Sequence, residues 1–129
     1  MRNEVLMALR SFIIAAGASA AATFVGVYGV FIGASAADMG WLQSTSNALS
    51  NSGQLIWGRI SDRVGRRAPF IIIASIASAI LWLYMAFVNS PIVLILTYAL
   101  LSLFGAMIAI NWYSMIVPRE AMLLILDRK

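Results

Sequence analysis

The sequence predicts an all-α membrane protein with four transmembrane helices. Apolar residues make up 62% of the 129 residues and charged residues only 11%, whereas a soluble chain is about half apolar and a quarter charged. The apolar residues form runs of about 20 residues, the length that a helix needs to cross a bilayer. The charged residues lie between these runs or near the ends of the chain.

The first span is predicted at about residues 12–34, after a polar lead that ends at Arg10. A cleavable signal peptide is the alternative, because Ala18-Ser19-Ala20 has the small-x-small shape of a cleavage site. The apolar run continues well past that point, which favours a span. Within it, Gly29 and Gly33 have the spacing that lets helices approach closely in lipid.

The second span is predicted at about residues 41–60, although this segment is the most polar of the four. On a helix its polar side chains fall within an arc of about 100°: Gln43, Asn47, Ser50, Asn51 and Gln54. Such a helix suits a bilayer if the polar arc faces protein or a water-filled path. The alternative is a helix that lies flat on the membrane, but those usually carry Lys or Arg on the polar face.

The distribution of basic residues favours a second span that crosses. If residues 41–60 cross, all nine Lys and Arg residues lie on one side: Arg2, Arg10, Arg59, Arg63, Arg66, Arg67, Arg119, Arg128 and Lys129. If they do not cross, Arg2 and Arg10 lie opposite the other seven. Because basic residues gather on the cytoplasmic side, we expect a crossing helix, a cytoplasmic loop at 61–68, and both termini in the cytoplasm of a cell-membrane protein.

The third span is predicted at about residues 69–88, opened by Pro69, which suits a first helical turn. Its small residues are expected to pack inward: Ala74, Ser75, Ala77, Ser78 and Ala79. Its bulky residues are expected to face lipid: Ile72, Ile76, Ile80, Leu83 and Phe87. The short turn Asn89-Ser90-Pro91 makes the fourth span, at about 92–117, an antiparallel neighbour. A cytoplasmic tail follows at 118–129.

Several polar and aromatic side chains are candidates for lining a cavity, with helix packing as the alternative for each. They are Tyr28, Gln43, Asn47, Asn51, Gln54, Tyr98, Trp112 and Tyr113. Asn111 falls on another side of the fourth span, where we expect it to bond a neighbouring helix, because lone polar residues in lipid seek partners.

The predicted loop between the second and third spans has a distinctive sequence. Together with the end of the second span it contains Gly58, Ser61, Asp62, Arg63, Gly65, Arg66 and Arg67. This stretch resembles the Gly-x-Leu-Ala-Asp-Arg-x-Gly-Arg-Arg motif of major facilitator superfamily transporters. From spacing alone, Asp62 reaches Arg59 and Arg66 if the turn stays helical. A loop that merely anchors and orients the chain is the alternative.

The resemblance implies a conformational latch and a larger architecture. It implies that Asp62 engages a helix of the other half, supported by Gly58, Gly65, Arg63 and Arg66. Family members have two six-helix halves, so the four spans correspond to part of the N-terminal half. The chain departs from the proton-coupled drug exporters, where an arginine stands four residues before a glycine of span four. Leu101 holds that place if Gly105 is the glycine.

The composition narrows the classes of function. With no Cys and no His, thiolate chemistry, the commonest metal ligand and the commonest acid–base group are excluded. We expect no enzyme, cofactor, metal or nucleic-acid partner.

The leading hypothesis is a truncated or partial transporter that moves a small solute by alternating access, with the bilayer and the missing helices, or further copies, as partners. One alternative is a four-helix dimeric exporter of the small multidrug kind, although the first span lacks the membrane glutamate of that group. The other is a non-transporting membrane subunit.

Overall fold

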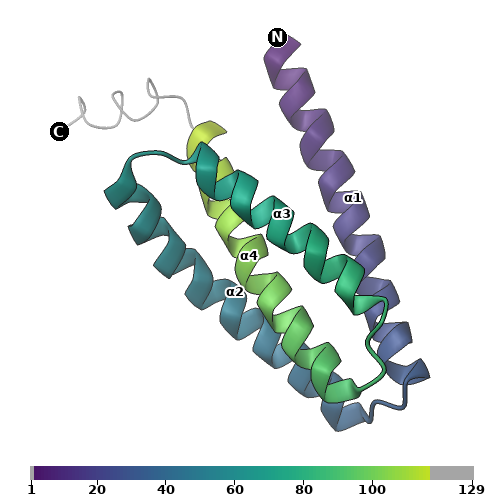
Figure 1. Ribbon diagram of the computed structural model, residues 1–129. Helices are drawn as coiled ribbons and strands as arrows, with labels where there is room; N and C mark the ends of the chain where they lie inside the picture. Colours follow the sequence, from purple (N-terminus) through teal and green to yellow (C-terminus); the bar gives the residue numbers. More distant parts are fainter. Residues whose placement is uncertain (1, 117–129) are drawn as a thin grey trace, which may run out of the picture.

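A computed structural model describes residues 2–116, which form four helices joined by short turns (Figure 1). The helices are α1 (Arg2–Phe31), α2 (Ala36–Val64), α3 (Ala68–Met85) and α4 (Pro91–Ile116). The predicted all-α fold is confirmed over these residues. The predicted tail at 118–129, with Arg119, Arg128 and Lys129, lies outside the described residues.

Three of the helices within residues 2–116 are long and apolar enough to cross a membrane: Val5–Phe31, Ala68–Met85 and Pro91–Met115. The remaining helix, α2, is too polar for its composition to identify it as a membrane span. Its 29 residues nevertheless extend for about 43 Å at 1.5 Å per residue. That length exceeds the hydrocarbon core, which is about 30 Å thick.

Glycine ends α1 in a tight turn. Gly33 adopts a left-handed conformation with φ of 89°, its N–H donates to Val30 O, and Ala34 N–H donates to Gly29 O. This pair of hydrogen bonds is the Schellman arrangement that satisfies the last carbonyls of a helix. The two glycines therefore have different roles: Gly29 packs against Met39 and Leu94, whereas the expectation that Gly33 also packs against a helix is wrong.

A capping box begins α2 immediately after this turn. Ser35 Oγ accepts from Asp38 N–H at 3.2 Å, and Ser35 N–H donates to Asp38 Oδ2 at 2.8 Å. These bonds satisfy two backbone donors that a helix start leaves open. The hydrogen bond from the Ser35 backbone, and then the one from its hydroxyl, lower the pKa of Asp38.

The helix α2 continues to Val64, so the turn to α3 is shorter than the predicted loop at 61–68. Gly65 ends the helix with φ of 68°, and its N–H donates to Ser61 O at 3.0 Å. Glycine suits this left-handed position because it has no Cβ to clash. Pro69 stands in the first turn of α3, as predicted.

The central helix is α4, which packs beside α2 and against α3 (Figure 1). The apolar core draws on all four helices near the end that carries the α1–α2 and α3–α4 turns. It contains Val25, Leu42, Met85, Val88, Leu94 and Leu101. Toward its N-terminus α1 diverges from the other helices (Figure 1).

The sequence predicts that α3 packs its small residues inward and exposes its bulky residues. The small residues that pack most tightly agree with this prediction. Ala74 is completely buried, and Ala77 and Ser78 are half-buried, while Ser75 and Ala79 remain exposed. The bulky residues on the other side are all exposed: Ile72, Ile76, Ile80, Leu83 and Phe87. In a bilayer these side chains are the ones available to contact lipid.

Asn111 does not form the predicted bond to a neighbouring helix. It is completely buried, and its Nδ2 donates to Met107 O of the same helix at 2.8 Å. A backbone carbonyl one turn earlier in the same helix can accept from a side-chain donor in this way.

The helices α2 and α4 pack closely together at Gly53. A methyl group added there would lie 2.9 Å from Leu103 Cδ1 and 3.2 Å from Ala106 Cβ. One and a half turns further along, the corresponding methyl at Gly58 would lie 3.7 Å from Ile110 Cγ1. The residue numbers rise together along this contact, so α2 and α4 run parallel.

We predict that Gly53→Leu destabilises the bundle by about 1–3 kcal/mol, because the added side chain would overpack the contact with α4. Gly40→Ala is the control, since a methyl group at Gly40 meets nothing within 4 Å. That change is expected to be neutral or to stabilise by up to about 1 kcal/mol through helix propensity. Denaturant unfolding in detergent, followed by circular dichroism, measures both, and equal stabilities for the two variants would contradict the close contact.

Candidate functional site

The parallel contact between α2 and α4 determines which of their remaining sides face the same way. Gly53 marks the side of α2 that faces α4. At 100° per residue, and viewed from the N-terminal end, the amide side chains of α2 are rotated clockwise from that side by about a quarter to nearly half a turn. Ala106 and Ile110 mark the side of α4 that faces α2. The aromatic side of α4 is rotated anticlockwise from that side by a similar angle. Because the helices run parallel and side by side, both sides point in one direction.

We name this surface the amide face. It consists of Gln43, Asn47, Asn51 and Gln54 of α2 with Tyr98, Ser102, Gly105, Trp112 and Tyr113 of α4. The four amide side chains, Gly105 and Tyr113 are exposed, and the other three residues are half-buried. Neither α1 nor α3 covers the amides, so these hydrogen-bonding groups remain available along much of α2.

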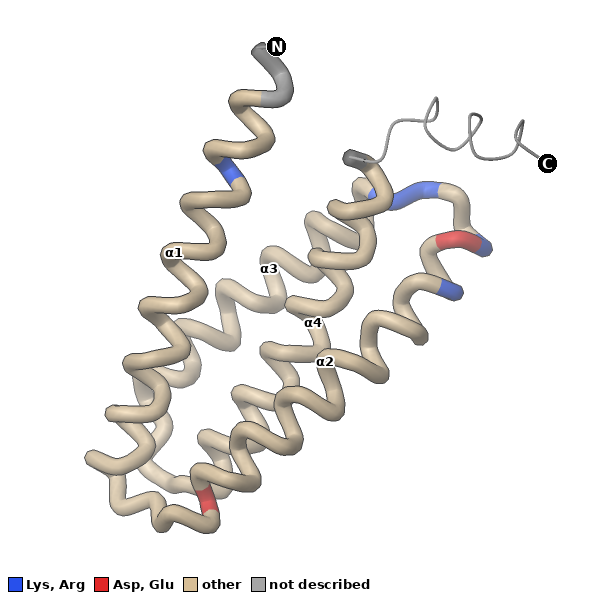
Figure 2. The backbone as a smooth tube through the Cα atoms, turned by 180° about the vertical axis from the view of Figure 1, so that it is seen from behind, with Lys and Arg blue, Asp and Glu red and all other residues tan. Residues whose placement is uncertain are grey.

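The residues that form the amide face are all uncharged. The described carboxylates are Asp38 and Asp62, which lie near opposite ends of α2 (Figure 2). Neutral amides and aromatic rings can bind a solute by hydrogen bonds and stacking. A proton relay through membrane-embedded carboxylates has no residues within the described part of the spans.

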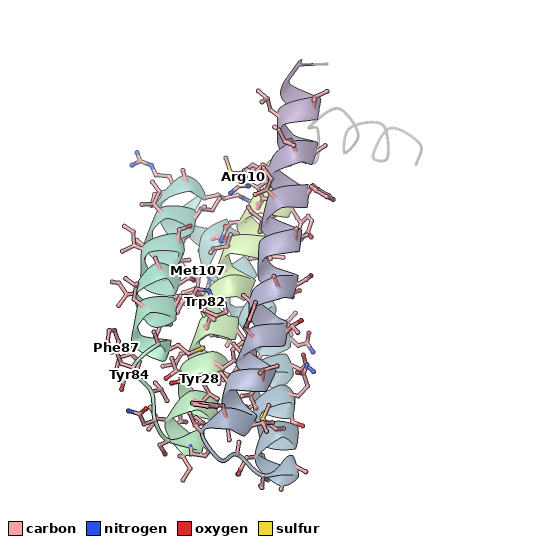
Figure 3. All side chains as sticks on the ribbon, turned by 90° about the vertical axis from the view of Figure 1, so that its right-hand side faces the viewer. Arg10, Tyr28, Trp82, Tyr84, Phe87 and Met107 are labelled. Atoms are coloured by element: carbon pink, nitrogen blue, oxygen red, sulfur yellow. The ribbon has the colours of Figure 1, made fainter. Side chains whose placement is uncertain are left out.

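One predicted lining residue, Tyr98, packs against the apolar core, and two others contact specific groups on neighbouring elements. Tyr28 lies on α1 (Figure 3), and its hydroxyl donates to Val88 O at 2.6 Å. The ring of Trp112 is covered by the guanidinium of Arg10, whose central carbon lies 3.4 Å from the ring centroid. Both residues therefore fasten α1 to the other helices in this structure, and Tyr28 does not belong to the amide face.

A second surface, which the sequence analysis missed, is an open apolar groove between α1 and α3 of about 410 Å³. It is lined by Ala21, Phe24, Val25, Val27, Tyr28, Phe31, Trp82, Met85 and Ala86. Figure 3 shows Tyr28 and Trp82, one from each helix. Periodicity could not reveal the groove, because the same apolar residues suit a lipid-facing surface equally well.

The contact between Arg10 and Trp112 also escaped the sequence analysis, although a signal for it exists. Arg10 lies about 20 residues before the end of α1, and Trp112 lies about 20 residues after the start of α4. Those two helix ends lie at the same end of the bundle, so the two residues are at the same depth in the membrane. A cation and an aromatic ring at equal depth on two helices are candidates for a cation–π pair.

The basic turn holds an ion pair different from the predicted ones. Asp62 Oδ1 accepts from Arg67 Nη2 at 2.8 Å. Arg66 is not one helical turn from Asp62, because α2 ends at Val64. The side chain of Asp62 is 66% exposed and that of Arg67 is 32% exposed. Exposed ion pairs of this kind contribute less than about 1 kcal/mol to the free energy of unfolding.

The other residues of the loop motif surround this pair. Ser61 is buried and its hydroxyl donates to Gly58 O at 3.1 Å. Arg63 and Arg66 are exposed at the same end of the molecule, whereas Asp38 lies at the opposite end (Figure 2). The Lys and Arg residues coloured in Figure 2, Arg10 among them, lie toward the end of the molecule that carries the basic turn.

Comparison with known proteins supplies the family. A model of the Major Facilitator Superfamily matches residues 7–118. Searches of curated proteins and of solved structures give no match. The family match spans all four helices and covers most of the sequence, and the chain therefore belongs to the major facilitator superfamily.

Proposed function

We propose that this chain carries a small solute across the cell membrane as part of a transporter that works by alternating access, with the amide face lining the solute path. Members of the family are transporters, which supports the general activity. The observation that carries the assignment of the path is the exposure of four amide side chains on a helix that runs parallel to an apolar span.

The energetics of the amide face support this assignment. Moving an amide side chain from water into hydrocarbon without a hydrogen-bond partner costs about 4–8 kcal/mol. Four such groups along one side of α2 would strongly disfavour direct contact with lipid. Water, solute or further protein must therefore satisfy them, and we propose further helices of the transporter or other copies of the chain around a solute path.

The basic residues support an orientation with both termini in the cytoplasm. Arg10 and the arginines of the α2–α3 turn lie toward one end of the bundle (Figure 2). The opposite end carries Asp38 and no described Lys or Arg. Because basic residues remain on the cytoplasmic side, the α2–α3 turn is proposed to face the cytoplasm.

We also propose that the α2–α3 turn acts as a latch. Asp62 is held by Arg67 in this structure, and this exposed pair is weak enough to be exchanged for another partner. In that role Asp62 would pair alternately with Arg67 and with a donor on a neighbouring helix. Gly58, Gly65, Arg63 and Arg66 would shape and anchor the turn.

A cysteine pair tests whether α2 borders water on its amide side. The chain has no cysteine, so single substitutions give a clean readout. We predict that Gln54→Cys reacts with a water-soluble charged thiol reagent in membranes and that Ile56→Cys does not, because Ile56 lies on the opposite side of α2 at nearly the same depth. Equal reactivity at the two positions would remove the argument for a path along the amide face.

A second variant pair tests the latch. Asp62→Asn is expected to change the unfolding free energy by less than about 1 kcal/mol, because the pair is exposed, and to reduce solute uptake by at least about tenfold if exchange of partners is required. Asp38→Asn, the same change at the other end of α2, should retain uptake. Uptake by reconstituted transporter measures both, and normal uptake in Asp62→Asn would contradict the latch.

A further inference from the structure

The helix α1 contacts the other helices at two separated places. Near the turns, Val25 is buried, Tyr28 donates to Val88 O, and Gly29 packs against Met39 and Leu94. Near the basic end, Arg10 stacks on Trp112 at 3.4 Å. Figure 3 shows Arg10 and Tyr28 far apart along α1.

Between these places α1 is not packed against the bundle. At 100° per residue Ile14 and Ala18 fall on the same side of α1 as Val25, yet both are exposed. A methyl group added at Gly17 would meet nothing within 4 Å. The divergence of α1 in Figure 1 agrees with this opening, and the long side chain of Arg10 reaches across to Trp112 at the basic end.

We propose that Arg10 and Trp112 form a catch that holds the basic end of α1 against α4, and that α1 pivots on its contacts at the other end when the catch opens. The described carboxylates do not compete for Arg10, because Asp38 bonds Ser35 and Asp62 pairs with Arg67. The partner of Arg10 within the described side chains is therefore an aromatic ring, and a cation–π contact at such a boundary is moderate in strength.

A contact of moderate strength suits a reversible catch. Its loss would change the ratio of open to closed populations by about tenfold, enough to shift the conformation without unfolding the helix. Trp112 belongs to the amide face, so release of Arg10 would uncover its ring at the cytoplasmic end of the proposed path. This consequence rests on the proposed function, whereas the movement of α1 does not.

Spin-label distances test the catch in the full chain reconstituted into lipid bilayers. One pair of spin-labelled cysteines, called the inner pair, replaces Phe12 and Met115 near the basic end of the bundle. A second pair, called the outer pair, replaces Phe31 and Phe87 at the end that carries the α1–α2 and α3–α4 turns. All four residues are exposed. We expect Arg10→Gln and Trp112→Leu each to add a longer distance for the inner pair, with the ratio of open to closed populations increased about tenfold. The outer pair should keep its distribution, which shows that the fold is intact.

Conservative variants and the double variant separate a catch from a general packing effect. Arg10→Lys and Trp112→Phe should give intermediate open populations, because a cation and a ring remain. The double variant Arg10→Gln with Trp112→Leu should resemble either single variant, because both remove one interaction. Unchanged inner distances, additive effects or a parallel change in the outer pair would each overturn the proposal, and none of these readouts depends on solute transport.

Discussion

The close contact of α2 with α4 at Gly53 is the interaction on which the rest of the structure depends. It places two backbones side by side and parallel, and it fixes how each helix is rotated about its own axis. Once that rotation is fixed, the amides of α2 and the aromatic side of α4 face the same way. A bulkier residue at Gly53 would separate the helices and change their rotation, so this packing contact determines where the polar side chains lie.

The amide face connects this packing to function through the solvent in which the protein folds. In water, exposed amides would need no explanation, whereas in hydrocarbon each one requires a partner. Elsewhere the bundle exposes large apolar side chains, for example Ile76 and Leu83 of α3. The molecule therefore has one side suited to lipid and another suited to water, solute or protein, as a helix bundle around a transport path requires.

The sequence predicted the fold better than the contacts between helices. Runs of apolar residues and the basic turn give four helices, because length and charge in a bilayer depend only on local sequence. Pairing depends on where a helix ends: the left-handed Gly65 stops α2 and brings Arg67 to Asp62 in place of Arg66.

The candidate site residues show the same difference between features of one helix and contacts between helices. Gln43, Asn47, Asn51 and Gln54 could be grouped from periodicity alone, since they share one side of one helix. The engagement of Tyr28 with Val88 O, and of Trp112 with Arg10, depends on two helices and could not be read from either.

The central claim is that α2 crosses the bilayer and carries the arginine-rich turn to the cytoplasmic side. The most direct measurement uses single cysteines at Val64, beside that turn, and at Asn89, in the α3–α4 turn at the other end of the bundle, both of which are exposed. A membrane-impermeant thiol reagent added outside intact cells should label Asn89→Cys and label Val64→Cys only after the membrane is permeabilised. Labelling of both positions in intact cells would contradict the account.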